Sequence, residues 1–435
     1  MKNIMKKILF EENRGIPSYC TANEIVIEAL LEHAKELNSE ILIEGTANQI
    51  NQFGGYTGMT PEDFRNYVFE IADRISFDKN KIILGADHFG PLVWANLKED
   101  EAMKNSVELV RLAVKAGFKK IHLDTSMKLA DDDPDERLPD EKIARRGAIL
   151  LAECEKIYQE LLKQNPDEIR PVYIIGSEVP IPGGAQEEDA GLQVTKVSDF
   201  ENTLRIYKEK FSEHGLSERL EDVIGVVVQP GVEFGDKDIH FYDRVKASEL
   251  SKALKKYSGI VFEGHSTDYQ TREKLHEMTE DGVKILKVGP ALTFALREGL
   301  FALSFIEREL LNEDRANFIE TLERVMLENP VNWQKHYHGS EREKFLARKY
   351  SYSDRCRYYL SNLEIKNSIK KLFANIDDLI SKNEILPGLL RQFMPRQYEK
   401  LQRGKLKFKA EALVKDFVIS VAEDYEGSEG LEVRS

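Results

Sequence analysis

Two short apolar segments of the sequence end in residues that could bind a metal ion. Residues 82–91 carry Asp87 and His88 at the end of the apolar run, and residues 260–268 carry His265 at the equivalent place. A short apolar run bounded by turn-forming residues is typical of a buried strand that ends at a loop. Two imidazoles from separate strands, completed by a carboxylate, are what a fixed divalent cation requires. An acid and a histidine after a strand can equally serve only to cap a turn, so the prediction depends on the two segments meeting in space.

Further polar residues follow predicted strands and extend this candidate site. Glu178 stands immediately beyond an apolar run and is a candidate third metal ligand, whereas the acidic residues after it are typical of a solvated loop. Asp124 ends another run, where a carboxylate could orient a ligand histidine or a substrate hydroxyl, or simply cap the loop. Weaker candidates on the same edge are Gln229, Glu233 and Asp268.

A phosphate group is expected at the ends of the last strands of a repeated β/α fold. Ser266 and Thr267 offer hydroxyl and backbone N–H groups there, and residues 287–293 lead into a helix N-terminus, which favours anions. The same segment could be an ordinary connection between a strand and a helix. Arg355 and Arg357 could supply cations from the C-terminal region, although exposed salt bridges are the commoner use of such arginines. The predicted substrate-binding residues are Ser266, Thr267, Gln229, Lys287, Gly289, Thr293 and Arg355.

These residues are carried by a strand-then-helix unit that repeats along the first part of the chain. Gly117, Gly259 and Gly282 each follow a predicted helix and precede a strand, which is the place of a left-handed helix cap. Eight such units predict an α/β protein with a (β/α)8 TIM barrel, whose typical size is about 250 residues. A doubly wound open sheet is the alternative, disfavoured because no Gly-x-Gly-x-x-Gly follows the first strand. The predicted strands are residues 16–20, 41–45, 82–86, 120–124, 172–176, 223–228, 260–264 and 283–288.

Local signals set the helix starts and the division of the chain. Thr21 and Glu24 have the spacing of a capping box that opens a helix, and Thr60 precedes a first-turn proline and two first-turn acids. Beyond Asn312 the pattern becomes helical and rich in charge, without clear strands. We therefore predict a barrel in residues 1–312 that bears the metal and substrate site, a C-terminal helical appendage packed on it in 313–425, and a flexible tail in 426–435.

The composition narrows the class of protein and its partners. A formal charge of −14, with 41% hydrophobic and 32% charged residues, describes a soluble globular protein and argues against a nucleic acid as the main partner. Cys20, Cys154 and Cys356 have neither disulfide-framework nor zinc-cluster spacing, which fits a reducing compartment. No apolar run is long enough for a signal peptide or a membrane span, so we expect a cytoplasmic protein without a membrane partner.

Six motifs taken together resemble the GatZ/KbaZ family, and the resemblance runs along nearly the whole chain. The motifs are Leu-Gly-Ala-Asp-His-Phe-Gly-Pro at 84–91, His-Leu-Asp-Thr-Ser-Met at 122–127, Ile-Gly-Ser-Glu-Val-Pro-Ile-Pro-Gly-Gly-Ala at 175–185, Glu-Gly-His-Ser-Thr-Asp-Tyr-Gln at 263–270, Val-Gly-Pro-Ala-Leu-Thr-Phe-Ala-Leu-Arg-Glu at 288–298 and Tyr-Ser-Asp-Arg-Cys-Arg-Tyr-Tyr at 352–359. That family was named as the non-catalytic subunit of class II tagatose-1,6-bisphosphate aldolase. It is in turn similar to the catalytic class II aldolases, which are zinc-dependent (β/α)8 enzymes.

The similarity to class II aldolases implies roles for the strand-end residues. The metal ligands would be His88, His265 and Glu178, with Asp87 acting as the acid and base. The small-residue segment after His265, with Ser266 and Thr267, would bind phosphate. One departure is clear, because Gln229 stands where the aldolases have a further metal histidine.

Members of the family are also implicated as ketose 4-epimerases, and an isomerase is our first hypothesis. Such an enzyme would interconvert D-tagatose 6-phosphate and D-fructose 6-phosphate, or the free sugars, by breaking and remaking the C3–C4 bond. A divalent metal, Zn, Mn, Ni or Co, would act as the Lewis acid, and Asp87 would move the proton of the C4 hydroxyl. The predicted catalytic residues are Asp87, Glu178, Asp124 and Asp268.

Two other functions remain open at this point. The chain could be a non-catalytic subunit that stabilises the catalytic subunit of tagatose-1,6-bisphosphate aldolase, or it could be an aldolase in its own right. In each case the expected small-molecule partner is a ketohexose or its phosphate. The sequence leaves the oligomeric state open, a homo-oligomer included.

Overall fold

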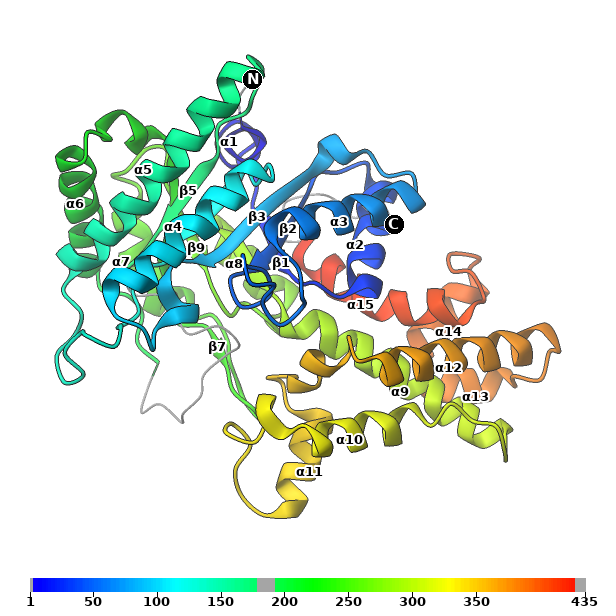
Figure 1. The fold of residues 1–435 in the computed structure, drawn as a ribbon. Coiled ribbons are helices and arrows are strands. Elements are labelled where there is room, and N and C mark those ends of the chain that lie inside the picture. The colour runs from blue at the N-terminus through cyan, green and yellow to red at the C-terminus, as the bar shows by residue number, and fades with distance from the viewer. Residues whose placement is uncertain (1–2, 178–191, 427–435) are drawn as a thin grey trace.

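The computed structural model describes residues 3–177 and 192–426, and it contains a closed barrel of eight parallel strands (Figure 1). The order around the barrel is β1-β10-β9-β6-β5-β4-β3-β2, so strands that follow one another along the chain are neighbours. The predicted (β/α)8 TIM barrel is therefore confirmed. The barrel strands are β1 Ile16–Cys20, β2 Ile41–Thr46, β3 Ile82–Phe89, β4 Lys120–Leu123, β5 Val172–Ile175, β6 Val223–Val228, β9 Val261–Gly264 and β10 Val283–Val288.

Helices connect the strands and surround the barrel. The predicted start of α3 is confirmed, because the Thr60 side chain accepts from the backbone N–H of Asp63 in a capping box. The capping box predicted at Thr21 is wrong, since Asn23 is the N-cap of α2 and accepts from two backbone N–H groups. The helices are α2 Glu24–Leu37, α3 Pro61–Arg74, α4 Glu99–Lys115, α5 Asp140–Gln164, α6 Val197–Glu213, α7 Arg244–Leu254, α8 Arg272–Glu280 and α9 Pro290–Leu310.

Glycines follow two helices where the sequence predicts left-handed caps. Gly117 and Gly282 come directly after the C-cap residues of α4 and α8, with φ values of 88° and 100°, a region that disfavours residues with a Cβ. The cap predicted at Gly259 is wrong, because α7 ends at Leu254 and its C-cap Lys255 has a right-handed backbone; Gly259, with φ 79°, lies in the turn before the next strand. The repeat therefore has a local cause in the sequence.

Apolar side chains close the amino-terminal end of the barrel. The segment α1 Ile4–Lys6 and η1 Lys7–Glu11 lies across this end, and it contributes Met5, Ile8 and Leu9 to a buried cluster inside the strands. The strand residues in this cluster are Ile16, Leu42, Ile83, Val172, Ile174, Ile224, Val227, Val261 and Ile285. The polar residues of the interior consequently gather at the other end, where the strands terminate.

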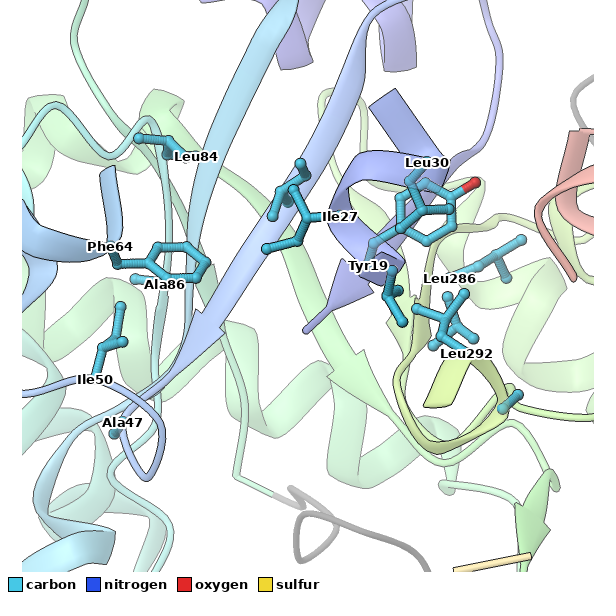
Figure 2. Close-up of a cluster of buried hydrophobic side chains, with 14 of the residues drawn as sticks. Tyr19, Ile27, Leu30, Ala47, Ile50, Phe64, Leu84, Ala86, Leu286 and Leu292 are labelled. Atoms are coloured by element: carbon cyan, nitrogen blue, oxygen red, sulfur yellow. The ribbon is translucent and has the colours of Figure 1, made fainter. Parts of the chain in front are cut away.

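A second, larger core lies between the strands and the helices. Figure 2 shows Phe64 of α3 beside Ala86 of β3 and Ile50, and Leu30 of α2 beside Tyr19 of β1. These side chains are almost completely buried, and burying one such side chain stabilises the fold by about 1.5–3 kcal/mol. The two cores hold the carboxyl ends of the strands in fixed positions.

The C-terminal helices, α10 to α15, lie on one side of the barrel in yellow to red (Figure 1). The last of them returns to the barrel, where Lys415 pairs with Glu28 of α2 and the Tyr425 hydroxyl donates to the carbonyl oxygen of Thr267. The predicted domain limits stay a prediction. The elements are α10 Phe318–Glu328, α11 Glu341–Tyr350, η6 Arg355–Tyr359, α12 Leu363–Ser381, α13 Pro387–Phe393, α14 Pro395–Gln402 and α15 Ala410–Glu426. None of the helices in the described residues is long and apolar enough to span a membrane.

Candidate metal and anion site

Three histidines from three strands meet at the carboxyl end of the barrel. The ring centroids of His88 and His265 lie 4.9 Å apart. The ring centroid of His122 lies 5.2 Å from that of His88 and 5.3 Å from that of His265. All three rings are buried. The two imidazoles expected to share a site therefore do lie together, with a third imidazole that was not predicted.

Four residues place metal-binding atoms close together at this point. Asp87, His122, Glu263 and His265 each offer one atom, and these atoms lie within 4.8 Å of one another. The Nδ1 of His88 lies 2.8 Å from Asp124 Oδ2, and its Nε2 lies 3.7 Å from Asp87 Oδ1 at the edge of this set. The predicted ligand Glu178 lies outside the described residues. Of the predicted ligands, His265 belongs to the four and His88 lies beside them.

His122 and Glu263 were missed because they lie inside apolar strands. Along a strand, side chains two residues apart point to the same face. His122 therefore faces the barrel mouth together with Asp124, and Glu263 does so together with His265. Two polar residues with this spacing at the end of an apolar strand were the signal that could have identified them.

Two lysines lie in the barrel interior among the carboxylates. Lys120 Nζ lies 2.7 Å from Glu44 and 2.6 Å from Glu263, and Lys287 Nζ lies 2.5 Å from Glu44 and 2.6 Å from Asp87. Gly85 separates Glu44 from Lys120 in the sheet, and a Cβ there would overlap the Glu44 side chain. The glycine thus leaves room for a charge network that fills the upper barrel.

The network determines how the candidate ligands titrate. Burial raises the pKa of Asp87, but the positive charges of His88 and Lys287 outweigh it and hold that pKa well below its usual value. Burial lowers the pKa of His265 to about 4. At neutral pH Asp87 is therefore an anion and His265 a neutral imidazole, which are the forms that bind a metal ion.

The donor set fits a divalent cation. Four carboxylates are buried here: Glu44, Asp87 and Glu263 lie within ion-pair distance of the ammonium groups of Lys120 and Lys287, and Asp124 contacts His88. With neutral imidazoles this leaves two negative charges, and with a protonated His88 it leaves one. Burying uncompensated charge is costly, so a cation at this position would stabilise the site.

His122 offers a second nitrogen that fits a cation. Its Nδ1 lies 3.3 Å from the backbone nitrogen of His88 and 3.3 Å from Asp87 Oδ1. Its Nε2 is buried, and among the described residues no hydrogen-bond partner is recorded for it. A proton on Nδ1, donated to Asp87, would leave a lone pair on Nε2 that a cation can take.

The residues predicted to bind phosphate form internal hydrogen bonds in this structure. The Thr267 hydroxyl donates to the Lys287 carbonyl oxygen at 2.8 Å. Asp268 Oδ1 accepts from the backbone N–H groups of Gly289, at 3.0 Å, and Ala291, at 2.8 Å. The N-terminus of α9, where an anion was expected, is thus occupied by the chain's own carboxylate, and Ser266 alone of the two hydroxyl residues lines the cavity.

Three other predicted substrate contacts have structural roles. Gln229 Oε1 accepts from the backbone N–H groups of Gly231 and Val232 and so holds a turn. The Thr293 hydroxyl donates to Asp354 at 2.6 Å, although Thr293 also lines the cavity. Arg355 donates to the Asn332 carbonyl oxygen and is not among the residues that line the cavity, so its contact with a substrate stays a prediction.

A cavity of about 500 Å³ opens above this cluster. Its floor includes Asp87, His88, His265 and Lys287, and its opposite wall comes from η6 and α12 of the C-terminal helices. Polar side chains from the loops after β1 and β2 line the space between. A cavity of this size, with convergent polar groups, is typical of a small-molecule site.

The chain is similar to known proteins over nearly its whole length. Residues 1–429 match the family described as D-tagatose-1,6-bisphosphate aldolase subunit GatZ/KbaZ-like. The chain is 43% identical over 426 residues to the "D-tagatose-1,6-bisphosphate aldolase subunit GatZ" of Escherichia coli O1:K1 / APEC, covering 98% of this chain and 99% of that protein. The protein of the same name from Shigella boydii serotype 18 is also 43% identical over 426 residues, with the same coverage.

A solved structure is similar in both fold and sequence. The crystal structure of a probable tagatose 6 phosphate kinase from Sinorhizobium meliloti 1021 has a TM-score of 0.86 and 42% identity to this chain. The match covers 95% of this chain and all of that one. The whole described fold, C-terminal helices included, is thus shared with a relative.

These comparisons correct the predicted activity. The expectation of an isomerase, a metal-dependent 4-epimerase, is wrong, because the relatives at 43% identity are named as aldolase subunits and not as epimerases. The alternative function, a subunit of the aldolase, is the one that the names favour.

Proposed function

We propose that this chain, which belongs to the GatZ/KbaZ-like family, is a subunit of D-tagatose-1,6-bisphosphate aldolase and acts together with a separate catalytic chain. The observation that carries this proposal is the 43% identity to subunits of that name over 98% of the chain. At this identity and coverage, the surfaces that bind a partner are expected to be retained along with the fold.

Two features of the barrel mouth support a subunit that leaves the aldol reaction to its partner. The strand position where class II aldolases have a further metal histidine carries Gln229, whose amide oxygen holds a turn. The helix N-terminus expected to bind phosphate carries Asp268. Both departures remove groups on which an aldolase of this class would depend.

We further propose that this subunit binds a divalent cation, Zn, Mn, Ni or Co, through Asp87, His122, Glu263 and His265. When bound, the cation would act as a Lewis acid toward the oxygens of a ketose. Asp124 holds the adjacent His88 ring through its Nδ1, and Lys120 and Lys287 fix the carboxylates, so the chain keeps the donor atoms in place.

The ligand of the cavity is proposed to be a phosphorylated tagatose. Both the GatZ relatives and the Sinorhizobium meliloti structure carry names that contain tagatose and phosphate. The cavity volume of about 500 Å³ falls in the range of small-molecule sites, which is about 300–1,000 Å³. We also propose that the protein acts in the cytoplasm, as the sequence predicts.

Co-expression with a catalytic subunit of tagatose-1,6-bisphosphate aldolase tests the main proposal. We expect the two chains to co-purify and the aldolase activity to survive heating longer in the complex, because binding to the folded state stabilises it. A class II fructose-1,6-bisphosphate aldolase, expressed with this chain in the same way, is the matched control. Absence of a complex, together with an unchanged half-life of the aldolase activity, would contradict the proposal.

A further inference from the structure

The wall of the cavity opposite the barrel mouth is positively charged. It contains Arg357 of η6 and Lys366 and Lys370 of α12. The two lysines are four residues apart in one helix, so they lie on the same face. Their charges repel each other, and an anion between them would relieve this repulsion.

The two lysines differ from the other charged residues around them. In the part of the chain that the structure describes, no carboxylate is recorded within ion-pair distance of Lys366 or Lys370, whereas Lys371 of the same helix pairs with Asp314. On the cavity wall, Glu24 pairs with Arg74, and Glu411 pairs with Lys415. Among the described residues, Lys366 and Lys370 are thus exposed cations that line a cavity and have no recorded carboxylate partner.

Arg357 is held in place beside them. Its guanidinium donates to the carbonyl oxygens of Ser353 and Asp354 and to the Tyr358 hydroxyl, and it lies 4.3 Å above the Tyr358 ring. A guanidinium fixed in this way loses little conformational freedom when it binds an anion. The N-terminus of α9, where the sequence predicts an anion site on the barrel, is occupied by Asp268.

We propose that Lys366, Lys370 and Arg357 form a phosphate-binding subsite for a phosphorylated sugar. The sugar's phosphate binds at this wall, and its hydroxyl and carbonyl oxygens extend across the cavity toward Asp87 and His265. This inference rests on the proposed function only for the choice of a tagatose phosphate. It places the recognition of phosphate on the C-terminal helices and not on the barrel.

Isothermal titration of the purified full-length chain tests this subsite. The probes are D-tagatose 6-phosphate and free D-tagatose, each in the presence of Mn²⁺. We expect the phosphorylated sugar to bind more tightly than the free sugar, and the K366Q/K370Q variant to bind the phosphorylated sugar at least about tenfold more weakly. The affinity for free D-tagatose should not change in this variant.

A matched control is available on the same helix. The K371Q variant changes a lysine that pairs with Asp314, and it should bind D-tagatose 6-phosphate like the wild type. Arg357→Lys gives a second test, since it keeps the charge and loses the planar donor geometry; we expect weaker binding of D-tagatose 6-phosphate at an unchanged affinity for free D-tagatose.

Three results would overturn the subsite. In the first, K366Q/K370Q binds D-tagatose 6-phosphate as tightly as the wild type does. In the second, the wild type binds the free and the phosphorylated sugar equally tightly. In the third, the wild type does not bind D-tagatose 6-phosphate. The aldolase complex is tested separately and without sugar. A chain that forms the complex but gives one of these results would contradict the subsite alone, and a chain that binds the sugar phosphate without forming the complex would contradict the subunit role alone.

Discussion

His122 and His265 approach the same carboxylates from two strands of the barrel. Burial lowers the pKa of His265 to about 4, so its ring is neutral across the physiological range. The Nδ1 atom of His122 lies 3.3 Å from Asp87 Oδ1. These residues are positioned to bind a cation, and their function can be tested one side chain at a time.

Replacing either histidine by alanine should abolish stoichiometric metal binding. For the wild type, a hundredfold excess of Zn²⁺ over its Kd should raise the free energy of unfolding by about 2.7 kcal/mol. The His122→Ala and His265→Ala variants should lose this stabilisation, because each removes one of four ligands. Metal content after dialysis and the melting temperature with and without EDTA measure the effect. The His276→Ala variant, which changes an exposed histidine, is the control. Full metal content in His122→Ala or His265→Ala would contradict the proposed ligand set.

Asp268 should make stability fall as the pH rises. Burial raises the pKa of this carboxyl from 3.8 to about 6, so between these values the folded state binds a proton that the unfolded chain has released. The stabilisation is therefore present at low pH and is lost as the pH rises through about 6.

The Asp268→Asn variant isolates this effect, because an amide keeps the acceptor oxygen and does not titrate. Between pH 5 and pH 7.5 the wild type should lose about 1 kcal/mol of unfolding free energy relative to the variant. Urea denaturation at the two pH values measures the difference. Glu160→Gln, at an exposed position, is the control and should lose the same unfolding free energy as the wild type between the two pH values. A wild type that gains stability relative to Asp268→Asn as the pH rises would contradict the role given to Asp268.

At the level of elements, one carboxylate connects the barrel to the C-terminal helices. Asp354, just before η6, accepts from the Thr293 hydroxyl and from Arg297 Nε, both on α9. The side chains of Arg297 and Asp354 are 2% and 1% exposed, so neither charge has access to water. The position of η6, and of Arg357 within it, depends on this contact.

Removing this carboxylate should destabilise the fold strongly. Asp354→Ala leaves the Arg297 charge buried without a partner, and such changes cost about 3–5 kcal/mol. Asp354→Asn should cost less, since asparagine keeps an acceptor and tolerates the left-handed backbone at this position, where φ is 45°. Urea denaturation measures both. In the exposed pair of Asp314 with Lys371, Lys371→Ala should cost less than about 1 kcal/mol, and an equally small effect of Asp354→Ala would contradict the role given to Asp354.

At the scale of the whole molecule, the cavity joins two parts of the chain that are far apart in sequence. The carboxyl ends of β3 and β9 form its floor, and α12 forms part of its wall. A ligand that fills the cavity would therefore contact both the barrel and the C-terminal helices. We expect ligand binding to restrict the motion of one against the other.

Hydrogen exchange should report this connection. D-tagatose 6-phosphate should slow amide exchange both in α12 and at the ends of β3 and β9, because local opening of either part would break contacts to the ligand. Mass spectrometry of the exchanged peptides measures the exchange rate in each element. Helix α6, which does not line the cavity, is the internal control. Protection confined to the barrel would argue against a ligand that spans the cavity.

Much of the fold could be predicted because its signals are local. The capping glycines at 117 and 282, the apolar runs of the strands and the Thr60 capping box each act within a few residues, and they are confirmed. Gly259 has the predicted left-handed backbone but lies beyond the end of its helix. The start of α2 was misplaced because two side chains, Thr21 and Asn23, could each serve as the cap. Two candidate ligands, His122 and Glu263, were overlooked because they lie within apolar strands.

The sequence by itself determined the barrel and the polar residues that stand at the ends of its strands. Only the tertiary structure decided which of these residues are used internally, as Thr267, Asp268 and Gln229 are, and which remain to face a ligand. The reason is physical. Helix and strand periods depend on neighbouring residues, whereas the partner of a buried polar group lies across the barrel or on a distant helix, and only packing brings the two together.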